Sequence, residues 1–143
     1  MRKTFNTIVK PEFRKTHTPQ CAKCMRFEPW GNAELVIHHK ISLIDGGTND
    51  DDNLIALCAS CHEEWHSHFD NGEEDFADWL RKPPLRYYAA IGMAKDKNSK
   101  MEMFQYLVNQ WRDIKEARMI SEPLKNDECI AYFKKYSKDW IDW

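Results

Sequence analysis

Two Cys-x-x-Cys pairs constrain the fold of this chain more than any other feature of its sequence. Cys21 and Cys24 form the first pair, and Cys58 and Cys61 the second. Zinc favours four thiolates in a tetrahedron at Zn–S distances of about 2.3 Å, and paired CxxC units in a cytoplasmic protein indicate metal binding rather than disulfides. We therefore expect one structural zinc, against the alternative of four unrelated reduced cysteines.

The residues around these pairs predict a small core of strands and a helix. We expect strands at 34–38 and 54–57, joined by a Gly-, Asn- and Asp-rich loop at 45–53. A helix should follow at 60–69, with Ser60 as N-cap and Glu63 completing a capping box. Pro11 and Pro19 favour extended or irregular structure over residues 1–20.

The remainder of the chain predicts helices. Residues 73–82 should form a helix that ends before Pro83-Pro84, and a last helix is expected near 127–137 with Ile130 and Phe133 inward. The clearest helix covers 100–119, where apolar residues recur every three or four positions: Phe104, Leu107, Val108, Trp111 and Ile114. Cys129 is expected to be a buried free thiol. Trp140 and Trp143 could pack back on the body or serve a partner.

Charge is distributed unevenly along the chain. Residues 1–40 carry a net charge of +5, residues 41–80 carry −11, and residues 81–143 carry +4. Phosphate contacts are therefore expected from the two basic flanks. The acidic middle, which includes Asp50, Asp51 and Asp52, fits a solvated face, but it could also discourage non-specific DNA binding or help to hold metals. The predicted phosphate contacts are Lys10, Arg14, Lys15, Arg81, Lys82 and Arg86.

Four histidines lie close to the cysteine pairs in the sequence. His38 and His39 are successive residues of the first predicted strand, so only one of them can face a given ion. His62 and His66 are four residues apart on the predicted helix and share a face. Together with one of the strand histidines they could form a three-imidazole metal site with positions left open for water or phosphate.

These residues, in this order, resemble the HNH (ββα-metal) endonucleases that carry two CxxC pairs. The resemblance covers residues 21–66 and rests on Val36-Ile37-His38-His39-Lys40-Ile41, Asp45-Gly46-Gly47, Asn53-Leu54 and Leu57-Cys58-Ala59-Ser60-Cys61-His62. It implies a small ββα-metal core with a structural zinc. Together with the helices predicted after this core, we expect an α+β protein with a mainly helical C-terminal extension. The expected organisation is a basic arm at 1–20, the core at 21–70 and the extension at 73–143.

The resemblance also implies roles for individual residues. His38 and His62 correspond to ligands of the catalytic divalent metal, and His66 to an extra helix histidine found in the colicin-type subset of the family. His39 corresponds to the general base that deprotonates the attacking water. Asn53 corresponds to the middle Asn, which holds the loop and thereby orients the base. The expected catalytic residues are thus His39, Asn53 and His62.

The expected function is metal-dependent hydrolysis of DNA phosphodiester bonds, by nicking or by double-strand cutting. The alternative is a non-catalytic, zinc-stabilised module that binds nucleic acid or protein. Beside structural Zn²⁺, the family implies Mg²⁺ or Mn²⁺ as the catalytic ion, with Ni²⁺ or Zn²⁺ as alternatives. We expect a DNA substrate and consider a protein partner that delivers the nuclease. Apolar runs stay well short of ~18 residues and the N-terminus lacks an apolar signal core, so a cytoplasmic protein is expected.

Overall fold

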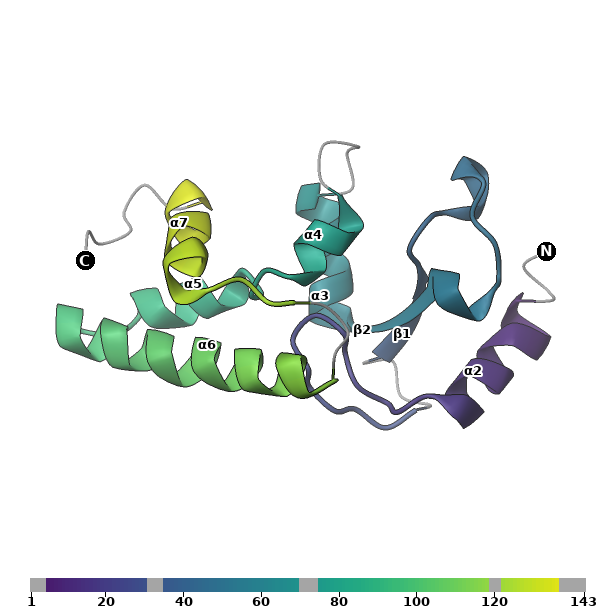
Figure 1. The fold of residues 1–143 in the computed structure, drawn as a ribbon, viewed down its shortest axis with the longest axis horizontal. Helices are drawn as coiled ribbons and strands as arrows, with labels where there is room; N and C mark the ends of the chain where they lie inside the picture. The colour runs from purple at the N-terminus through teal and green to yellow at the C-terminus, as the bar shows by residue number, and fades with distance from the viewer. Residues whose placement is uncertain (1–4, 31–34, 70–74, 119–121, 137–143) are drawn as a thin grey trace. The chain divides into compact units, whose positions relative to one another are not determined.

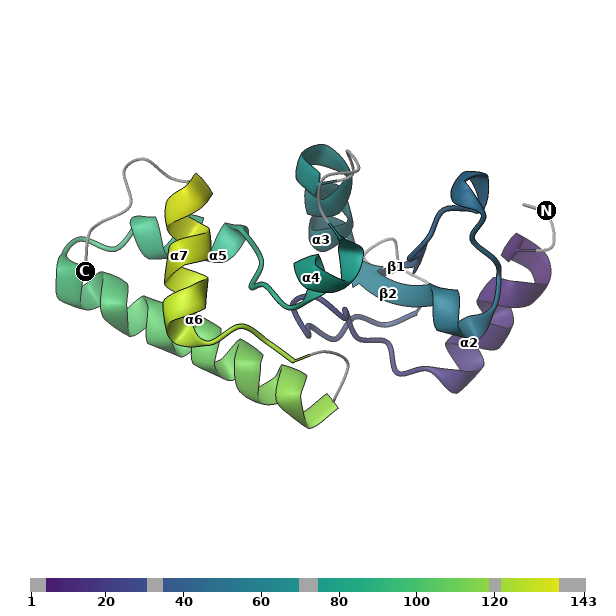
Figure 2. The same cartoon turned by 45° about the horizontal axis from the view of Figure 1, so that its top comes forward.

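The computed structural model describes residues 5–30, 35–69, 75–118 and 122–136 (Figures 1 and 2). The chain divides into two compact units. The first comprises Met1–Ala22 and Arg26–Asn71, and the second comprises Lys23–Met25 and Gly72–Trp143. Over the described ranges, none of the helices has the length and apolar character needed to span a membrane.

The first unit contains a two-stranded antiparallel sheet. Strand β1 is Leu35–His39 and strand β2 is Leu54–Cys58, each within one residue of its predicted bounds. The register pairs Leu35 with Cys58 at one end and His39 with Leu54 at the other. Every residue of β2 is buried, whereas β1 is mostly half-buried. The histidines of β1 therefore stay accessible on a strand whose partner forms core.

The loop between the strands contains two short 3-10 turns, η2 at Leu43–Asp45 and η3 at Asp51–Asn53. Gly46 and Gly47 are each required in this loop, for different reasons. Gly46 has φ of 92°, a left-handed conformation that favours glycine. Gly47 lies so close to the backbone of Ile41 and Ser42 that a Cβ atom would collide with both. The Gly-Gly pair thus allows the chain to fold back tightly beside β1.

Helix α3, Ala59–Glu64, follows β2 directly and continues into a π-helical turn, η4, at Trp65–Phe69. The predicted N-cap at Ser60 is wrong, because the N-cap is Cys58. The Cys58 Sγ accepts a hydrogen bond from the Cys61 backbone N–H at 3.5 Å. A cysteine therefore caps the helix, and Ser60 is an exposed residue in its first turn.

The prediction of extended or irregular structure for residues 1–20 is wrong for residues 5–16, whereas residues 17–20 are irregular as predicted. Phe5–Val9 forms a π-helical segment, η1, and Lys10–Thr16 forms helix α2. Pro11 lies in the first turn of α2, where its missing N–H leaves no helical hydrogen bond unmade. Phe5 and Phe13 are 6% and 4% exposed, so burial of two aromatic rings stabilises this segment against the first unit.

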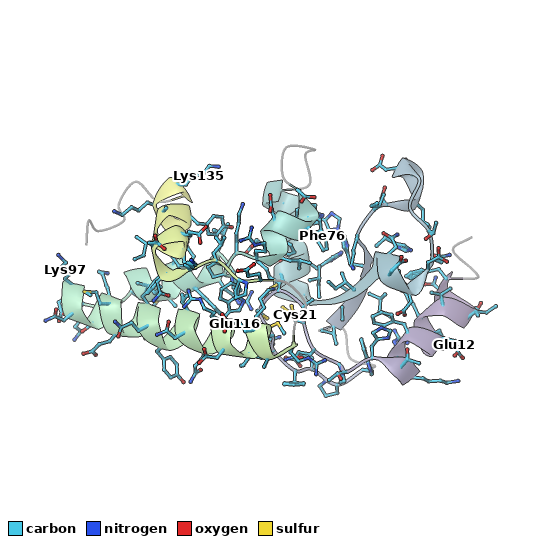
Figure 3. All side chains as sticks on the ribbon, viewed as in Figure 1. Glu12, Cys21, Phe76, Lys97, Glu116 and Lys135 are labelled. Atoms are coloured by element: carbon cyan, nitrogen blue, oxygen red, sulfur yellow. The ribbon has the colours of Figure 1, made fainter. Side chains whose placement is uncertain are left out.

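The second unit is helical. Its helices are α4 (Phe76–Leu80), α5 (Arg86–Gly92), α6 (Lys97–Arg118) and α7 (Asn126–Tyr136). Trp79, Ile91, Val108 and Phe133 are completely buried among them, and α5 packs against α6. Charged side chains at Lys97, Glu116 and Lys135 extend away from the helices (Figure 3). Helix α5 was not predicted, because Pro83-Pro84 both ends one helix and precedes the next.

Helix α6 confirms the predicted periodicity with one correction. Phe104, Val108 and Trp111 are buried, but Ile114 is 42% exposed and the next residue, Lys115, is fully buried. Lys115 Nζ and Trp111 Nε1 donate to the Lys23 carbonyl at 3.5 and 2.6 Å. The apolar pattern predicted Ile114 as the buried residue of this turn. The buried residue is Lys115 instead, because its ammonium group can donate to the Lys23 carbonyl. Trp140 and Trp143 lie outside the described residues.

Candidate functional site

The four CxxC cysteines come together as one buried cluster. Their sulfur atoms all lie within 4.8 Å of one another, and none of the four is in a disulfide. A tetrahedron with Zn–S distances of about 2.3 Å has sulfurs about 3.8 Å apart. The cluster is thus compatible with zinc binding, and all four cysteines are at most 7% exposed.

The first pair lies in a hairpin-like knuckle. Cys21 N–H donates to Arg26 O at 2.9 Å, and Glu28 N–H donates to Pro19 O at 3.0 Å. Met25 has φ of 67°, which lets the chain reverse immediately after Cys24. Ala22 N–H donates to Ala56 O in β2 at 2.9 Å. The same turn that presents the thiolates is thus bonded to the sheet.

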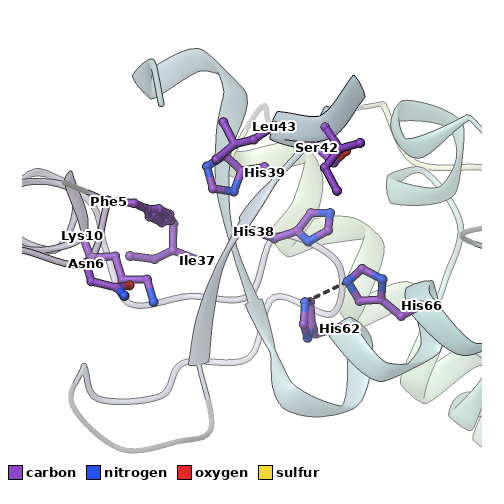
Figure 4. Close-up of a pocket in the computed structure, with 11 residues that line it drawn as sticks. Phe5, Asn6, Lys10, Ile37, His38, His39, Ser42, Leu43, His62 and His66 are labelled. Atoms are coloured by element: carbon purple, nitrogen blue, oxygen red, sulfur yellow. Dashed lines mark hydrogen bonds between the residues drawn. The ribbon is translucent and has the colours of Figure 1, made fainter. Parts of the chain in front are cut away.

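Three histidines form a second cluster, which is composed of His38 from β1, His62 from α3 and His66 from η4 (Figure 4). Each offers a ring nitrogen within 4.8 Å of the others. His62 Nε2 and His66 Nε2 are 3.0 Å apart, and the ring centroid of His38 is 5.4 Å from each of theirs. The structure therefore brings together the three imidazoles that the sequence predicted as a metal site.

The electrostatics of this cluster favour the neutral form of His62, and neutral imidazole is the form that binds metal. Partial burial lowers the pKa of His62, and the nearby positive charge of a protonated His66 lowers it further. A histidine with a lowered pKa keeps its lone pair at neutral pH. His66 is exposed and His62 half-buried, so one side of the cluster faces solvent and could admit water or a phosphate oxygen.

His39 has different neighbours from His38, as strand alternation predicts. Its Nε2 lies 2.8 Å from Asn49 Oδ1. Its ring makes an edge contact with Phe5, with centroids 4.4 Å apart at 65°. His39 stays half-buried in this environment. Neither Asn49 nor Phe5 was singled out from the sequence. Asn49 could have been suspected only as a second asparagine in the loop, and Phe5 carried no signal.

Asn53 holds the loop backbone rather than the imidazole. Its Oδ1 accepts from Ile41 N–H at 2.9 Å. Its Nδ2 donates to Ile41 O at 3.0 Å and to Thr48 O at 2.7 Å. The Asn53 backbone O also accepts from Lys40 N–H at 2.8 Å. At 9% exposure, this side chain ties together the start and the far side of the loop that follows His39.

The three-histidine cluster and His39 line the same cavity, which has a volume of about 560 Å³ and lies in the first unit (Figure 4). His38, His39, His62 and His66 form part of its wall, and η1 and α2 contribute Phe5, Asn6 and Lys10. Lys10 Nζ lies 5.0 Å from the centroid of the Phe5 ring. The cavity thus combines a candidate metal cluster, a separate imidazole and one lysine.

Two other predicted phosphate contacts belong to the first unit but do not line this cavity. Arg14 and Lys15 are exposed on α2, and Lys15 pairs with Glu12 at 3.3 Å. The remaining three belong to the second unit and make contacts within it. Arg81 Nε donates to Glu122 O at 2.8 Å, Lys82 Nζ lies 5.2 Å from the Tyr132 ring centroid, and the Arg86 guanidinium lies 5.8 Å from that of Tyr87.

Cys129, the fifth cysteine, is a buried free thiol in the second unit, as predicted. Burial raises its pKa to about 11. Its Sγ lies 3.8 Å from Arg112 Nη2. A protonated, enclosed thiol fits a packing role and neither metal binding nor nucleophilic chemistry.

Comparison with known proteins matches the segment that carries both clusters. The HNH endonuclease family model matches residues 21–68. A relative in Escherichia coli (strain K12), the type IV methyl-directed restriction enzyme EcoKMcrA, is 42% identical over 50 residues; the match takes in 32% of this chain and 18% of the relative. No solved structure matches the chain. The family match, the cysteine cluster and the two-stranded sheet with its helix agree, and residues 21–68 are accordingly an HNH endonuclease domain.

Proposed function

We propose that this chain is a metal-dependent endonuclease that hydrolyses DNA phosphodiester bonds. The observation that carries the proposal is that the two histidines of β1 have different neighbours. His38 belongs to the three-histidine cluster, whereas His39 lines the same cavity and is not part of the cluster. One set of imidazoles can hold a cation while a separate imidazole remains to accept a proton. Phosphodiester hydrolysis requires both.

In the proposed reaction His39 accepts a proton from a water molecule whose oxygen attacks phosphorus. The bond between phosphorus and the 3′ oxygen breaks, and that oxygen takes up a proton from solvent. A divalent cation held by His38, His62 and His66 would stabilise the negative charge on the phosphate and on the leaving oxygen. Lys10 lines the cavity and would contact a substrate phosphate, which positions the strand without selecting its sequence.

The cysteine cluster would hold a structural zinc, with Cys21, Cys24, Cys58 and Cys61 as its ligands. The four donors are all sulfur and fully enclosed, as structural zinc sites are, whereas the open three-histidine cluster resembles a catalytic site. The family implies Mg²⁺ or Mn²⁺ for the catalytic ion, although three imidazole donors also suit Ni²⁺ or Zn²⁺.

The test is cleavage of supercoiled plasmid by zinc-loaded protein with Mg²⁺, Mn²⁺, Ni²⁺ or EDTA. The variants are His39→Ala and, as a matched control, His17→Ala. His17 stacks on Phe13 with ring centroids 3.8 Å apart and does not line the cavity. We expect metal-dependent relaxed or linear products that His17→Ala retains and His39→Ala loses by a factor of about 10² or more.

Two results would count against the nuclease. Equal cleavage by His39→Ala would exclude His39 as the base. No cleavage with any of the metals, from protein that contains one zinc, would favour a zinc-stabilised module that binds nucleic acid or protein without cutting it.

A further inference from the structure

We propose that Asn49 is a positioning residue that fixes the tautomer of His39, so that Nε2 carries the ring proton and Nδ1 is the atom that accepts a proton from water. The inference rests on the proposed nuclease function. It starts from a contact 2.8 Å long between Asn49 Oδ1 and His39 Nε2. It concerns a loop residue that lies four positions before the family's middle Asn, Asn53.

The chemistry of the two atoms in contact selects the tautomer. An amide oxygen has lone pairs and no proton, so it can only accept a hydrogen bond. A neutral imidazole has one N–H and one bare nitrogen. When Nε2 donates to Asn49, the lone pair is on Nδ1. Within the described part of the chain, Nδ1 of His39 has no hydrogen-bond partner, so that lone pair stays available to accept a proton.

Phe5 restricts the same ring from a second direction. Its edge contact with His39, at 4.4 Å between centroids, limits rotation of the imidazole about its bond to Cβ. The Asn49 contact holds Nε2 of His39 in place, and the Phe5 contact restricts the plane of the His39 ring. A general base needs both, because proton transfer depends on a short and well-directed approach to water.

The loop explains why Asn49 can do this reliably. Asn53 Nδ2 binds Thr48 O at 2.7 Å, which fixes the backbone directly before Asn49. The Thr48 hydroxyl and Asp50 exchange two further hydrogen bonds, at 2.9 and 3.2 Å. Asn53 therefore holds the loop, and Asn49 extends from it to the imidazole. The resemblance gives Asn53 the role of orienting the base. Under this proposal Asn53 orients His39 indirectly, by holding the loop from which Asn49 binds the imidazole.

Single-turnover and steady-state cleavage by Asn49→Ala separates positioning from folding. We expect kcat to fall about 10- to 100-fold, as for the loss of an orienting partner of a site histidine, while KM changes less than about threefold because no phosphate contact is lost. Asn49→Asp keeps an oxygen acceptor in place and should recover most of kcat. Thr48→Val removes the two side-chain bonds to Asp50 but keeps the bond from Asn53 to the Thr48 carbonyl. Asn49 should therefore stay in place, and kcat should remain within about threefold of that of the unchanged protein.

A second measurement reads the tautomer without cleavage. Nitrogen-15 NMR of the His39 ring distinguishes protonated from bare nitrogens, and it is recorded on the zinc-loaded full chain above the ordinary histidine pKa of about 6.5. We expect the Nε2–H tautomer in the unchanged protein and in Asn49→Asp. Asn49→Ala should give a mixture of both tautomers.

The outcomes separate this inference from the proposed function. An Nδ1–H tautomer in the unchanged protein, or full kcat in Asn49→Ala, overturns the role of Asn49 even if the protein is a nuclease. An equal fall of kcat in Thr48→Val and Asn49→Ala also overturns it, because general loosening of the loop would then explain both. Absence of all cleavage overturns the proposed nuclease, while the NMR result still upholds or overturns the hydrogen bond itself.

Discussion

Replacing Asn53 by alanine should destabilise the first unit through the loop backbone. The change removes three side-chain hydrogen bonds, at 2.9, 3.0 and 2.7 Å. At about 1 kcal/mol net for each, the free energy of unfolding should fall by about 3 kcal/mol. Ile41, which makes two of these bonds, is 56% exposed, so water can replace part of the loss. The expected value is therefore about 2 to 3 kcal/mol.

Urea denaturation of the zinc-loaded protein measures this loss, and hydrogen exchange locates it. The Ile41 amide loses its acceptor in Asn53→Ala and should exchange faster than the β2 amides. Asn49→Ala is the matched control, because it removes an asparagine from the same loop but only one hydrogen bond, worth about 1 kcal/mol. Equal destabilisation by the two variants, or a loss below about 0.5 kcal/mol for Asn53→Ala, would refute the assignment of Asn53 to the backbone.

Three further predictions concern the zinc cluster, the free thiol and the cavity lysine. Chelation of zinc, or Cys58→Ser, should abolish amide protection in the two-stranded sheet, measured by hydrogen exchange together with zinc content; a protected sheet without zinc would contradict this. Cys129 should resist iodoacetamide at neutral pH until the protein is denatured, as followed by mass spectrometry. Because its pKa is raised to about 11 from 9.0, the stability it contributes should be complete below pH 9 and decline as the pH rises toward 11. Lys10→Ala should raise KM and lower the slope of log binding constant against log salt by about 1, whereas Lys125→Ala, an exposed lysine that is not among the predicted phosphate contacts, should leave both unchanged.

The parts of the site that sequence could predict follow from local rules. Alternation along a strand separates His38 from His39, and a spacing of four on a helix brings His62 and His66 to one face. The cysteine spacing likewise predicted a cluster. Each of these statements needs only the geometry of one element, together with the family's order of elements.

The parts that sequence could not predict depend on contacts between distant segments. Phe5 meets His39 across 34 positions of sequence, and no local pattern relates them. The burial of Lys115 depends on the Lys23 carbonyl, 92 residues away. Asn49 was hidden among the polar residues of its loop, because a loop sequence indicates a turn but does not show which side chain will reach an imidazole. The helical structure at 5–16 was missed because Pro11 was read as a helix breaker although it lies in the first turn of α2, and because no local pattern shows that Phe5 and Phe13 become buried.

The geometry of the site depends on the register of a very short sheet. A one-residue slip of β1 against β2 would exchange the environments of His38 and His39, and an isolated two-stranded sheet is only marginally stable in water. The hairpin is fixed at both ends. Cys58, in the cysteine cluster, pairs with Leu35 at one end, and Asn53 binds the backbone just beyond His39 at the other. Metal loading at the cysteine cluster should therefore influence which histidine of β1 joins His62 and His66, even though no cysteine lines the cavity.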